Sequence, residues 1–495
     1  MDAEASGALK PPRLAQRLGL WLGLAVSSAL LLIGPPSTVG EPAWHVAALV
    51  SLMAIWWVTE AIPIPVTSLL PMVVLPMAGI SSMKAAAAPY ASPIVMLLLG
   101  GFIIAKSIER WNLHERIALH IVVRAGNHPA ALVGGFMVAA AFLSMWISNS
   151  ATTIMLTPIA ISVAAAVLGN GDVKGAPFTL SLLLGLAYAA SIGGLGTPVG
   201  TPTNLIVIGY LAEQTGQEIS FAQWMLIGLP AVFIMLPAAW IVVTKFAFPI
   251  ETDTAHQGAQ AIKHRLLTLG AITVPEKRVM VTFALIALAW IIRKPINTLA
   301  FSGFRPFEGL SDPLIAIAGA IALFMIPSGA KGSPKVPLLN WEIAQAIPWG
   351  VILLFGGGLS LAGAITSSGL AAWLGGELAA LTDLSPIVIM LALTAFVIFA
   401  TEISSNVATA SALLPIIGAI ASAGGSDPIA LAMPVAMAAS CAFMLPMATG
   451  PNAIIFASGQ VSIAQMARAG IRLNLVGVIL LTGLSYVLVP LLFSA

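Results

Sequence analysis

The chain has 495 residues, of which 59% are hydrophobic and only 8% are charged. Soluble proteins carry roughly 25% charged residues, so this composition predicts a polytopic membrane protein. The net charge of +2 gives no nucleic-acid-binding footprint, and the single Cys441 excludes a disulfide within the chain and a cysteine-based metal cage.

Hydropathy predicts eleven membrane-crossing segments, because a spanning helix needs about 20 mainly apolar residues. The first follows Lys10, Arg13 and Arg17 and has no convincing small-residue cleavage site after it, so we expect a retained helix. In chain order the predicted spans are 16–34, 43–61, 64–82, 92–109, 178–213, 224–248, 279–293, 311–327, 348–368, 428–460 and 470–493.

Two further apolar stretches are too long for one crossing. Residues 129–171 contain no Asp, Glu, Lys, Arg or His, and residues 384–426 contain only Glu402. As a continuous helix each would extend about 65 Å at 1.5 Å per residue, and no bilayer is that thick. Each stretch must therefore turn back, either as two spans or as a re-entrant hairpin.

One motif occurs in both stretches. Ser-Asn-Ser-Ala-Thr at residues 148–152 recurs as Ser-Asn-Val-Ala-Thr at residues 405–409, an offset of 257 positions. Downstream, Thr-Pro-Thr-Asn at 201–204 parallels Thr-Gly-Pro-Asn at 449–452. Duplicated polar breaks in apolar segments are typical of secondary transporters, which bind their cargo between internal repeats.

Positive charges orient the predicted spans. With the N-terminus in the cytoplasm, seventeen Lys and Arg residues lie inside and four lie outside, namely Lys84, Arg293, Lys294 and Arg305. Five crossings then separate the two turn-back stretches, so the halves are inverted in the membrane. We expect the C-terminus outside, and the cell inner (plasma) membrane as the location.

Three other segments complete the predicted organisation. Residues 111–123 and their counterpart 369–381 are expected to lie along the membrane surface. Residues 251–278 fall in the longest polar stretch and are predicted to form a cytoplasmic connector between the halves. No soluble domain is expected.

The two Ser-Asn turns are the candidate binding site. A turn inside the bilayer frees backbone groups, which survive only where they are buried or face a cavity. Ser and Asn oxygens suit a hard cation, and helix N-termini at the turn favour an anion. Helix capping is the alternative for a single copy, and the duplication favours binding. The Thr-Pro-x-Asn and Thr-Gly-Pro-Asn segments are predicted to break helices that face the tips, with simple proline kinks as the alternative.

Charged residues near the turns are few. Glu402 precedes Ser405 by three positions, and it is equally a functional candidate or a structural partner for the hairpin tip. Glu60 is expected to have a structural or interfacial role. No Lys or Arg is expected near either turn, so a bound anion would need cations and helix ends to balance its charge, which makes cotransport physically sensible. No enzyme motif occurs in a workable context.

At these residues the chain resembles the divalent-anion/sodium symporter family, which includes sodium-coupled dicarboxylate and citrate transporters. The resemblance covers nearly the whole chain and is most specific at residues 56–63, 144–149 and 448–452 and at the two tips. It implies an all-α fold with two re-entrant hairpins in an inverted repeat, a homodimer, and an elevator-like motion. The implied scaffold comprises 1–125 and 279–383, and the implied transport domain comprises 126–250 and 384–495.

The resemblance also divides roles among residues, with at least two sodium ions as coupling ions. The positions that match a first sodium site are Ser144, Ser148, Asn149 and Gly200. Those that match a second are Thr401, Ser404, Asn406 and Ala448. The substrate-facing positions are Ser148, Asn149, Ser150, Thr201, Ser405, Asn406, Val407 and Thr449.

Two motifs depart from the family pattern. The family tip motif is Ser-Asn-Thr; Ser150 keeps a hydroxyl, whereas Val407 has none and forgoes a hydrogen bond worth roughly 0.5–1.5 kcal/mol. Gly450 stands where Pro is usual. Both changes bear on the identity of the substrate and leave the sodium positions largely intact.

We therefore expect a sodium-coupled symporter of a small di-anion, foremost a C4-dicarboxylate such as succinate, fumarate or malate. The alternatives are a sodium-independent dicarboxylate exchanger, a citrate or sulfate transporter of the same family, and, from another class, a cation/proton antiporter with Glu402 as proton carrier. The expected partners are the di-anion, membrane lipid and a second copy of the chain.

Overall fold

The computed structural model describes residues 14–169, 173–250, 256–300, 305–377, 384–423 and 427–493. Some predicted segments lie partly outside these ranges: the N-terminal segment at 1–13, the connector at 251–255, and the second part of the scaffold at 301–304 and 378–383. Of the helices in the described residues, nine are long and apolar enough to cross a membrane. The fold is all-α and polytopic, as predicted.

The N-terminal helices are α1 (Leu14–Ile33), α2 (Glu41–Thr59), α3 (Ile64–Thr67) and α4 (Leu70–Met77). Within the predicted span 64–82, the helix is interrupted at Ser68 and Leu69 and ends at Met77. Pro71 has no N–H to donate to the carbonyl of Thr67, so the hydrogen-bond ladder cannot run through this point.

The next group leads into the first turn-back. It consists of α5 (Met83–Ala87), the 3-10 turn η1 (Ala88–Ala91), α6 (Pro93–Arg110) and α7 (Leu113–Val123). Asn112, with a left-handed backbone (φ 52°), separates α6 from α7. The buried Arg116 of α7 lies 2.7 Å from Glu276, which fixes α7 to the beginning of α14 (Val274–Asn297). The two segments expected along the membrane surface form α7 and, within the described residues, α18 (Leu370–Glu377).

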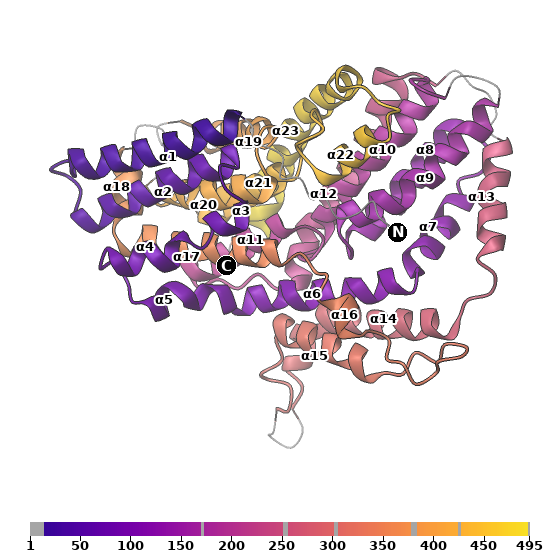
Figure 1. Cartoon of the computed structure of the whole chain (residues 1–495), viewed down its shortest axis with the longest axis horizontal. Coiled ribbons are helices and arrows are strands. Elements are labelled where there is room, and N and C mark those ends of the chain that lie inside the picture. Colours follow the sequence, from indigo (N-terminus) through magenta and orange to yellow (C-terminus); the bar gives the residue numbers. More distant parts are fainter. Residues whose placement is uncertain are drawn as a thin grey trace, which may run out of the picture.

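The helix is broken at the Ser-Asn motif in both stretches, and the first stretch turns back on itself, as predicted. The first is α8 (Pro129–Ser144) followed by α9 (Asn149–Leu168), and the second is α19 (Pro386–Ala400) followed by α20 (Asn406–Ala423). With 16 residues, α8 is about 24 Å long, which is shorter than the roughly 30 Å hydrocarbon core. In Figure 1, α8 and α9 lie side by side, and they pack against each other and against α10 (Pro177–Gly193). In the second stretch, α19 packs on α21 (Pro428–Ala439) and α23 (Ile463–Phe493), and α20 packs on α21 and α18.

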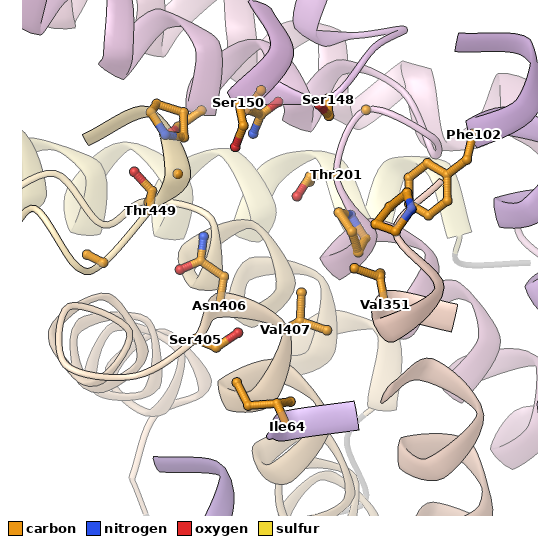
Figure 2. Close-up of a pocket in the computed structure, with 18 of the residues that line it drawn as sticks. Ile64, Phe102, Ser148, Ser150, Thr201, Val351, Ser405, Asn406, Val407 and Thr449 are labelled. Carbon is orange, nitrogen blue, oxygen red and sulfur yellow. The ribbon is translucent and has the colours of Figure 1, made fainter. Parts of the chain in front are cut away.

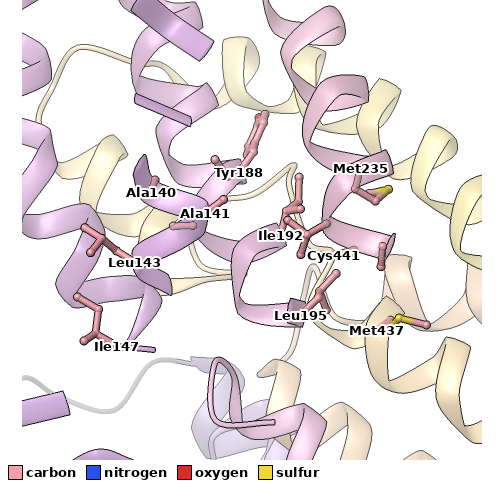
Figure 3. Packing of buried hydrophobic residues seen from close by; sticks show 14 of the residues in the cluster. Ala140, Ala141, Leu143, Ile147, Tyr188, Ile192, Leu195, Met235, Met437 and Cys441 are labelled. Carbon is pink, nitrogen blue, oxygen red and sulfur yellow. The ribbon is translucent and has the colours of Figure 1, made fainter. Parts of the chain in front are cut away.

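Two helices are broken where the sequence predicts it. After α10 come the 3-10 turn η2 (Gly194–Gly196), a non-helical loop and α11 (Pro202–Thr215). After α21, a similar loop leads to α22 (Gly450–Ala457). Because α10 is apolar and buried on all sides, it lies at the centre of the fold. Figure 3 shows its Ile192 in one cluster with Ala141 of α8, Met235 of α12 (Phe221–Ile241) and Met437 of α21.

The remaining elements are the π-helical end of α12, η3 (Val242–Ala247), and α13 (His256–Thr268), α15 (Asp312–Met325), α16 (Trp341–Ala344) and α17 (Trp349–Ser367). The predicted span 311–327 is a helix of only 14 residues, because Pro327 disfavours helical backbone at Ile326. The predicted connector is not simply extended chain: it contains α13, which packs on α9 and α7 (Figure 1). Large apolar side chains remain exposed on α1 and α14, as expected of lipid-facing or partner-facing surfaces.

Candidate functional site

A cavity of about 900 Å³ lies where the two tips and the two helix breaks meet. Figure 2 shows Ser150, Thr201, Asn406 and Thr449 around one open space, with Val407 on the side toward Val351. The cavity brings together most of the residues predicted for the site, namely Ser148, Asn149, Ser150, Gly200, Thr201, Ser404, Ser405, Asn406, Val407, Ala448 and Thr449. Ser144 and Thr401 are fully buried and are not among its lining residues.

The first tip is built around a helix cap. Ser148 has extended backbone, and its hydroxyl oxygen accepts a hydrogen bond from the Ala151 N–H at 3.1 Å, which begins α9. Asn149 and Ser150 therefore occupy the first turn of α9 and line the cavity. The N-terminal end of a helix carries a positive partial charge, so this tip favours a negative ligand.

Two oxygens at the first tip have no protein partner. Ser144 Oγ and Asn149 Oδ1 are buried, and no described residue forms a hydrogen bond with either atom. A side-chain Cβ at Gly200 would lie 2.5 Å from the carbonyl oxygen of Gly194 and 3.0 Å from that of Ser144, so only glycine lets the loop approach this closely. Buried oxygens without partners are rare in proteins, and two of them at the first tip fit a hard cation.

The donor set also limits the kind of cation. Within the described ranges, no group of three His, Cys, Asp or Glu side chains is placed to hold a metal ion. A cation at the tips would be held by neutral hydroxyl, amide and carbonyl oxygens. Such ligands suit hard metal ions rather than zinc or copper.

Two asparagines fix the loops behind the tips. Asn204 Nδ2 donates to the carbonyl oxygens of Gly194 at 2.9 Å and Thr197 at 2.8 Å. Asn452 Nδ2 makes the equivalent bonds, to Ala442 at 3.2 Å and Leu445 at 3.1 Å. Both asparagines thus anchor the loops that precede them. The sequence signal for this role was the duplicated Thr-x-x-Asn motif.

The second tip differs from the first in its hydrogen bonds. Thr401 Oγ1 lies 2.7 Å from Asn406 Oδ1 and 3.0 Å from the carbonyl oxygen of Ala439. Ser404 Oγ lies 2.5 Å from Thr409 Oγ1. The oxygens of the second tip are thus engaged with one another.

Glu402 holds the loop that follows α21. Its side chain accepts hydrogen bonds from the backbone N–H groups of Phe443, Met444 and Leu445 at 2.7, 2.9 and 3.0 Å, and from Asn474 Nδ2 at 2.7 Å. It is 3% exposed and does not line the central cavity. Of the two roles open from the sequence, the structure favours the structural one. All four partners donate hydrogen bonds to the carboxylate, an arrangement that a proton carrier would not need.

The expectation that no Lys or Arg lies near the turns is wrong. Lys106 of α6 lines the cavity, together with Glu109 and Glu60. Lys106 Nζ lies 2.7 Å from Glu109 Oε2, so its charge is matched within one helix turn. These three side chains sum to −1, and the cavity still lacks a net positive wall. Sequence could not reveal this neighbour, because tertiary packing brings α6 to the tips.

Sequence reasoning also missed Ser191. This residue of α10 is 2% exposed and lines the cavity, and its hydroxyl has no hydrogen-bond partner in the part of the chain that the structure describes. A serine in an apolar helix, one turn before the Gly194 break, was the available signal. Figure 2 shows the apolar side chains of Ile64, Phe102 and Val351 across the cavity from Ser150 and Thr449.

Two helix pairs whose Ser-Asn tips line one cavity, together with two broken helices that line it as well, define a secondary membrane transporter. The family model described as the sodium:sulfate symporter transmembrane region matches residues 14–494. The chain belongs to this family, which confirms the resemblance seen in the sequence.

Known relatives cover nearly the whole chain. The sodium-dependent dicarboxylate transporter SdcS of Staphylococcus saprophyticus is 40% identical over 486 residues, covering 97% of this chain and 93% of that protein. SdcS of Staphylococcus aureus is 41% identical over 491 residues, covering 98% and 93%. Among solved structures, the Alcanivorax borkumensis YdaH transporter (TM-score 0.57, 18% identity, covering 95% of this chain and 98% of that one) and Neisseria gonorrhoeae MtrF (0.59, 14%, 93% and 96%) share the fold.

Proposed function

We propose that this protein couples sodium to the transport of a small di-anion, foremost a C4-dicarboxylate such as succinate, fumarate or malate. The observation that carries the proposal is the central cavity, which is lined by Asn149, whose side-chain oxygen is unpaired within the described residues, and by the N-terminal residues of α9, α20 and α22. Oxygens attract a cation and helix N-termini favour an anion. The SdcS relatives are named sodium-dependent dicarboxylate transporters, which supports the same cargo and coupling ion. The proposed role is transport, not catalysis.

At least two sodium ions serve as coupling ions in this proposal. Ser144, Ser148, Asn149 and Gly200 hold the first, and Thr401, Ser404, Asn406 and Ala448 hold the second. The unpaired oxygens of Ser144 and Asn149 fit this role. Because the charged side chains of the cavity sum to −1, each sodium ion supplies positive potential that the di-anion needs, and the di-anion strengthens sodium binding equally.

The proposed cargo site lies between the two tips. Its residues are Ser148, Asn149, Ser150, Thr201, Ser405, Asn406, Val407 and Thr449. Each tip offers a Ser-Asn pair at the beginning of a helix, and two such ends suit two carboxylates. The apolar wall at Phe102 and Val351 suits the hydrocarbon part of the cargo.

We further propose an elevator-like motion. Residues 126–250 and 384–495 form the transport domain, 1–125 and 279–383 form the scaffold, and 251–278 connect the halves. The cavity supports this division, since the tips and helix breaks line it together with residues of α2, α3 and α6. The exposed apolar faces of α1 and α14 offer surface for lipid or for a second copy in a homodimer. The proposed location is the cell inner (plasma) membrane, with the N-terminus in the cytoplasm and the C-terminus outside.

Uptake of radiolabelled succinate into proteoliposomes tests the proposal. We expect uptake driven by an inward sodium gradient, and little uptake when potassium replaces sodium on both sides. Uptake that is indifferent to sodium would refute the coupling, and sodium-free counterflow of dicarboxylates would identify an exchanger instead.

A second candidate cargo is sulfate or citrate. Val407 favours it, because this side chain removes a hydroxyl from the second tip. Competition against succinate uptake by fumarate, malate, citrate and sulfate separates these cargoes. The antiporter alternative has less support, since the hydrogen bonds of Glu402 account for its place in the fold.

A further inference from the structure

The two proposed sodium sites occupy equivalent positions in the repeat but differ in hydrogen bonding. Ser144 and Asn149 correspond to Thr401 and Asn406, 257 positions later. In the first half the two side-chain oxygens are unpaired. In the second half they lie 2.7 Å apart and share a hydrogen bond. The first site is therefore open to a cation, whereas the second is closed by its own residues.

Thr401 has a second acceptor in reach. Its hydroxyl has one proton and lies 2.7 Å from Asn406 Oδ1 but only 3.0 Å from the carbonyl oxygen of Ala439. When the proton turns to Ala439, Asn406 Oδ1 and the lone pairs of Thr401 Oγ1 are both free to face a cation. Rotation of one hydroxyl thus opens the second site.

Ala439 is joined to the cargo side of the cavity through its neighbour. Ser440 Oγ lies 2.6 Å from Thr203 Oγ1, a contact between the second half and the first. Thr203 Oγ1 lies 3.4 Å from Thr201 Oγ1, and Thr201 lines the cavity. Thr203 and Ser440 are 0% and 1% exposed, so water does not compete for the hydrogen bond between their hydroxyls. Side-chain contacts thus run from Thr201 to Ser440, and the backbone joins Ser440 to Ala439, whose carbonyl oxygen lies 3.0 Å from Thr401 Oγ1 at the second tip.

We propose that the Thr203–Ser440 pair and the Thr401 hydroxyl form a relay that couples cargo binding at Thr201 to the opening of the second sodium site. The inference rests on the proposed function and deepens it. It makes the sodium sites inequivalent: the first fills without cargo, and the second fills with it. Thr203 and Ser440 act as positioning residues, since neither lines the cavity.

Thermal unfolding of the purified full-length protein tests the relay, because a ligand of the native state raises the midpoint with its concentration. Sodium is titrated against choline, with and without succinate. For the unchanged protein we expect sodium stabilisation without succinate, and a shift of the sodium dependence to at least threefold lower concentration with saturating succinate.

Thr203→Val and Ser440→Ala each remove one hydroxyl of the bridge. We expect each to reduce the succinate-induced shift by more than half, while sodium stabilisation without succinate changes less than twofold. The double variant loses no more than either single variant, because one bridge is removed in each case. Thr179→Val is the matched control, since Thr179 of α10 is buried and its hydroxyl has no partner among the described residues.

Retention of the full shift in both variants would overturn the relay, as would equal loss of the sodium response without succinate. Thr203→Ser, which keeps the hydroxyl, must retain the shift, and this variant decides the question if Thr203→Val does not fold. Absence of any sodium or succinate response in the unchanged protein would instead refute the proposed function.

Discussion

Two residues at which this chain departs from the family pattern touch each other. A Cβ at Gly450 would lie 2.0 Å from Ser150 Oγ and 3.3 Å from Ser150 Cβ. The added Cβ would force the Ser150 hydroxyl to rotate away, and its contact with Ser150 Cβ would be tight. The small side chain at the first tip and the missing side chain at the beginning of α22 therefore depend on each other.

Gly450→Ala is therefore expected to lower stability by about 1–3 kcal/mol through overpacking. Ser150→Ala in the same chain should restore most of this loss, because only the 3.3 Å contact remains. Thermal unfolding of the single and double variants measures the effect. Gly483→Ala in α23 is the control, since no atom lies within 4 Å of its added Cβ. Equal unfolding midpoints for Gly450→Ala with and without Ser150→Ala would contradict the contact.

Val407 is the residue through which we expect cargo preference to change. Val407→Thr has nearly the same shape and adds a hydroxyl at the second tip. A neutral hydrogen bond corresponds to roughly a two- to tenfold change in affinity, so uptake of malate relative to succinate should rise by that factor. Competition assays measure the ratio, and expression should stay unchanged. An unaltered ratio across succinate, malate and citrate would place Val407 outside the cargo site.

Asn149 offers a separation of binding from folding. Its Oδ1 has no hydrogen-bond partner within the described ranges, so Asn149→Ala removes no protein hydrogen bond through this oxygen. We expect the variant to fold with a near-normal unfolding midpoint and to lose both transport and sodium stabilisation. Asn406→Ala should also abolish transport, with some loss of stability because Asn406 pairs with Thr401. Normal transport by Asn149→Ala would refute the site assignment.

At the scale of elements, the sequence foretold the parts that depend on local chemistry. A continuous helix over the uncharged residues 129–171 would be longer than any bilayer is thick, so the sequence predicted a reversal. Pro198, Gly200 and Pro202 predicted the break after α10. The hydrogen-bond partners of Glu402 could not be predicted, since Asn474 and the loop after α21 reach it only through tertiary packing. The place of Lys106 in the cavity wall could not be predicted for the same reason.

Glu402→Gln tests the structural role of this carboxylate. The amide replaces one acceptor oxygen with an NH₂ group, which faces backbone N–H donors and leaves at least one unsatisfied. An unsatisfied buried donor costs about 1–3 kcal/mol, so we expect a lower unfolding midpoint and reduced transport. Any residual transport should keep the pH dependence of the unchanged protein. A stable variant that loses only its pH dependence would support proton carriage instead.

At the scale of the whole molecule, aromatic side chains join the first tip to the proposed scaffold. Trp146 stacks on Phe221 at 6.2 Å between ring centroids, and Phe221 stacks on Trp290 of α14 at 4.5 Å. Phe283 of α14 meets Trp146 edge-on at 5.0 Å. Asp312 of α15 accepts the Phe221 N–H at 2.8 Å. These contacts cross the proposed boundary between the moving and static domains.

An elevator-like motion requires these contacts to separate during each cycle, because packed interfaces switch between discrete arrangements rather than stretch. Trp146→Cys and Phe283→Cys, combined with Cys441→Ala, place one thiol on each side of the boundary. A short bifunctional methanethiosulfonate joins them reversibly. We expect cross-linking to stop succinate uptake and reduction to restore it. Each single-cysteine variant with the same reagent is the control. Undiminished uptake by fully cross-linked protein would exclude movement of residues 126–250 relative to 279–383, and would require the cargo to cross between fixed domains.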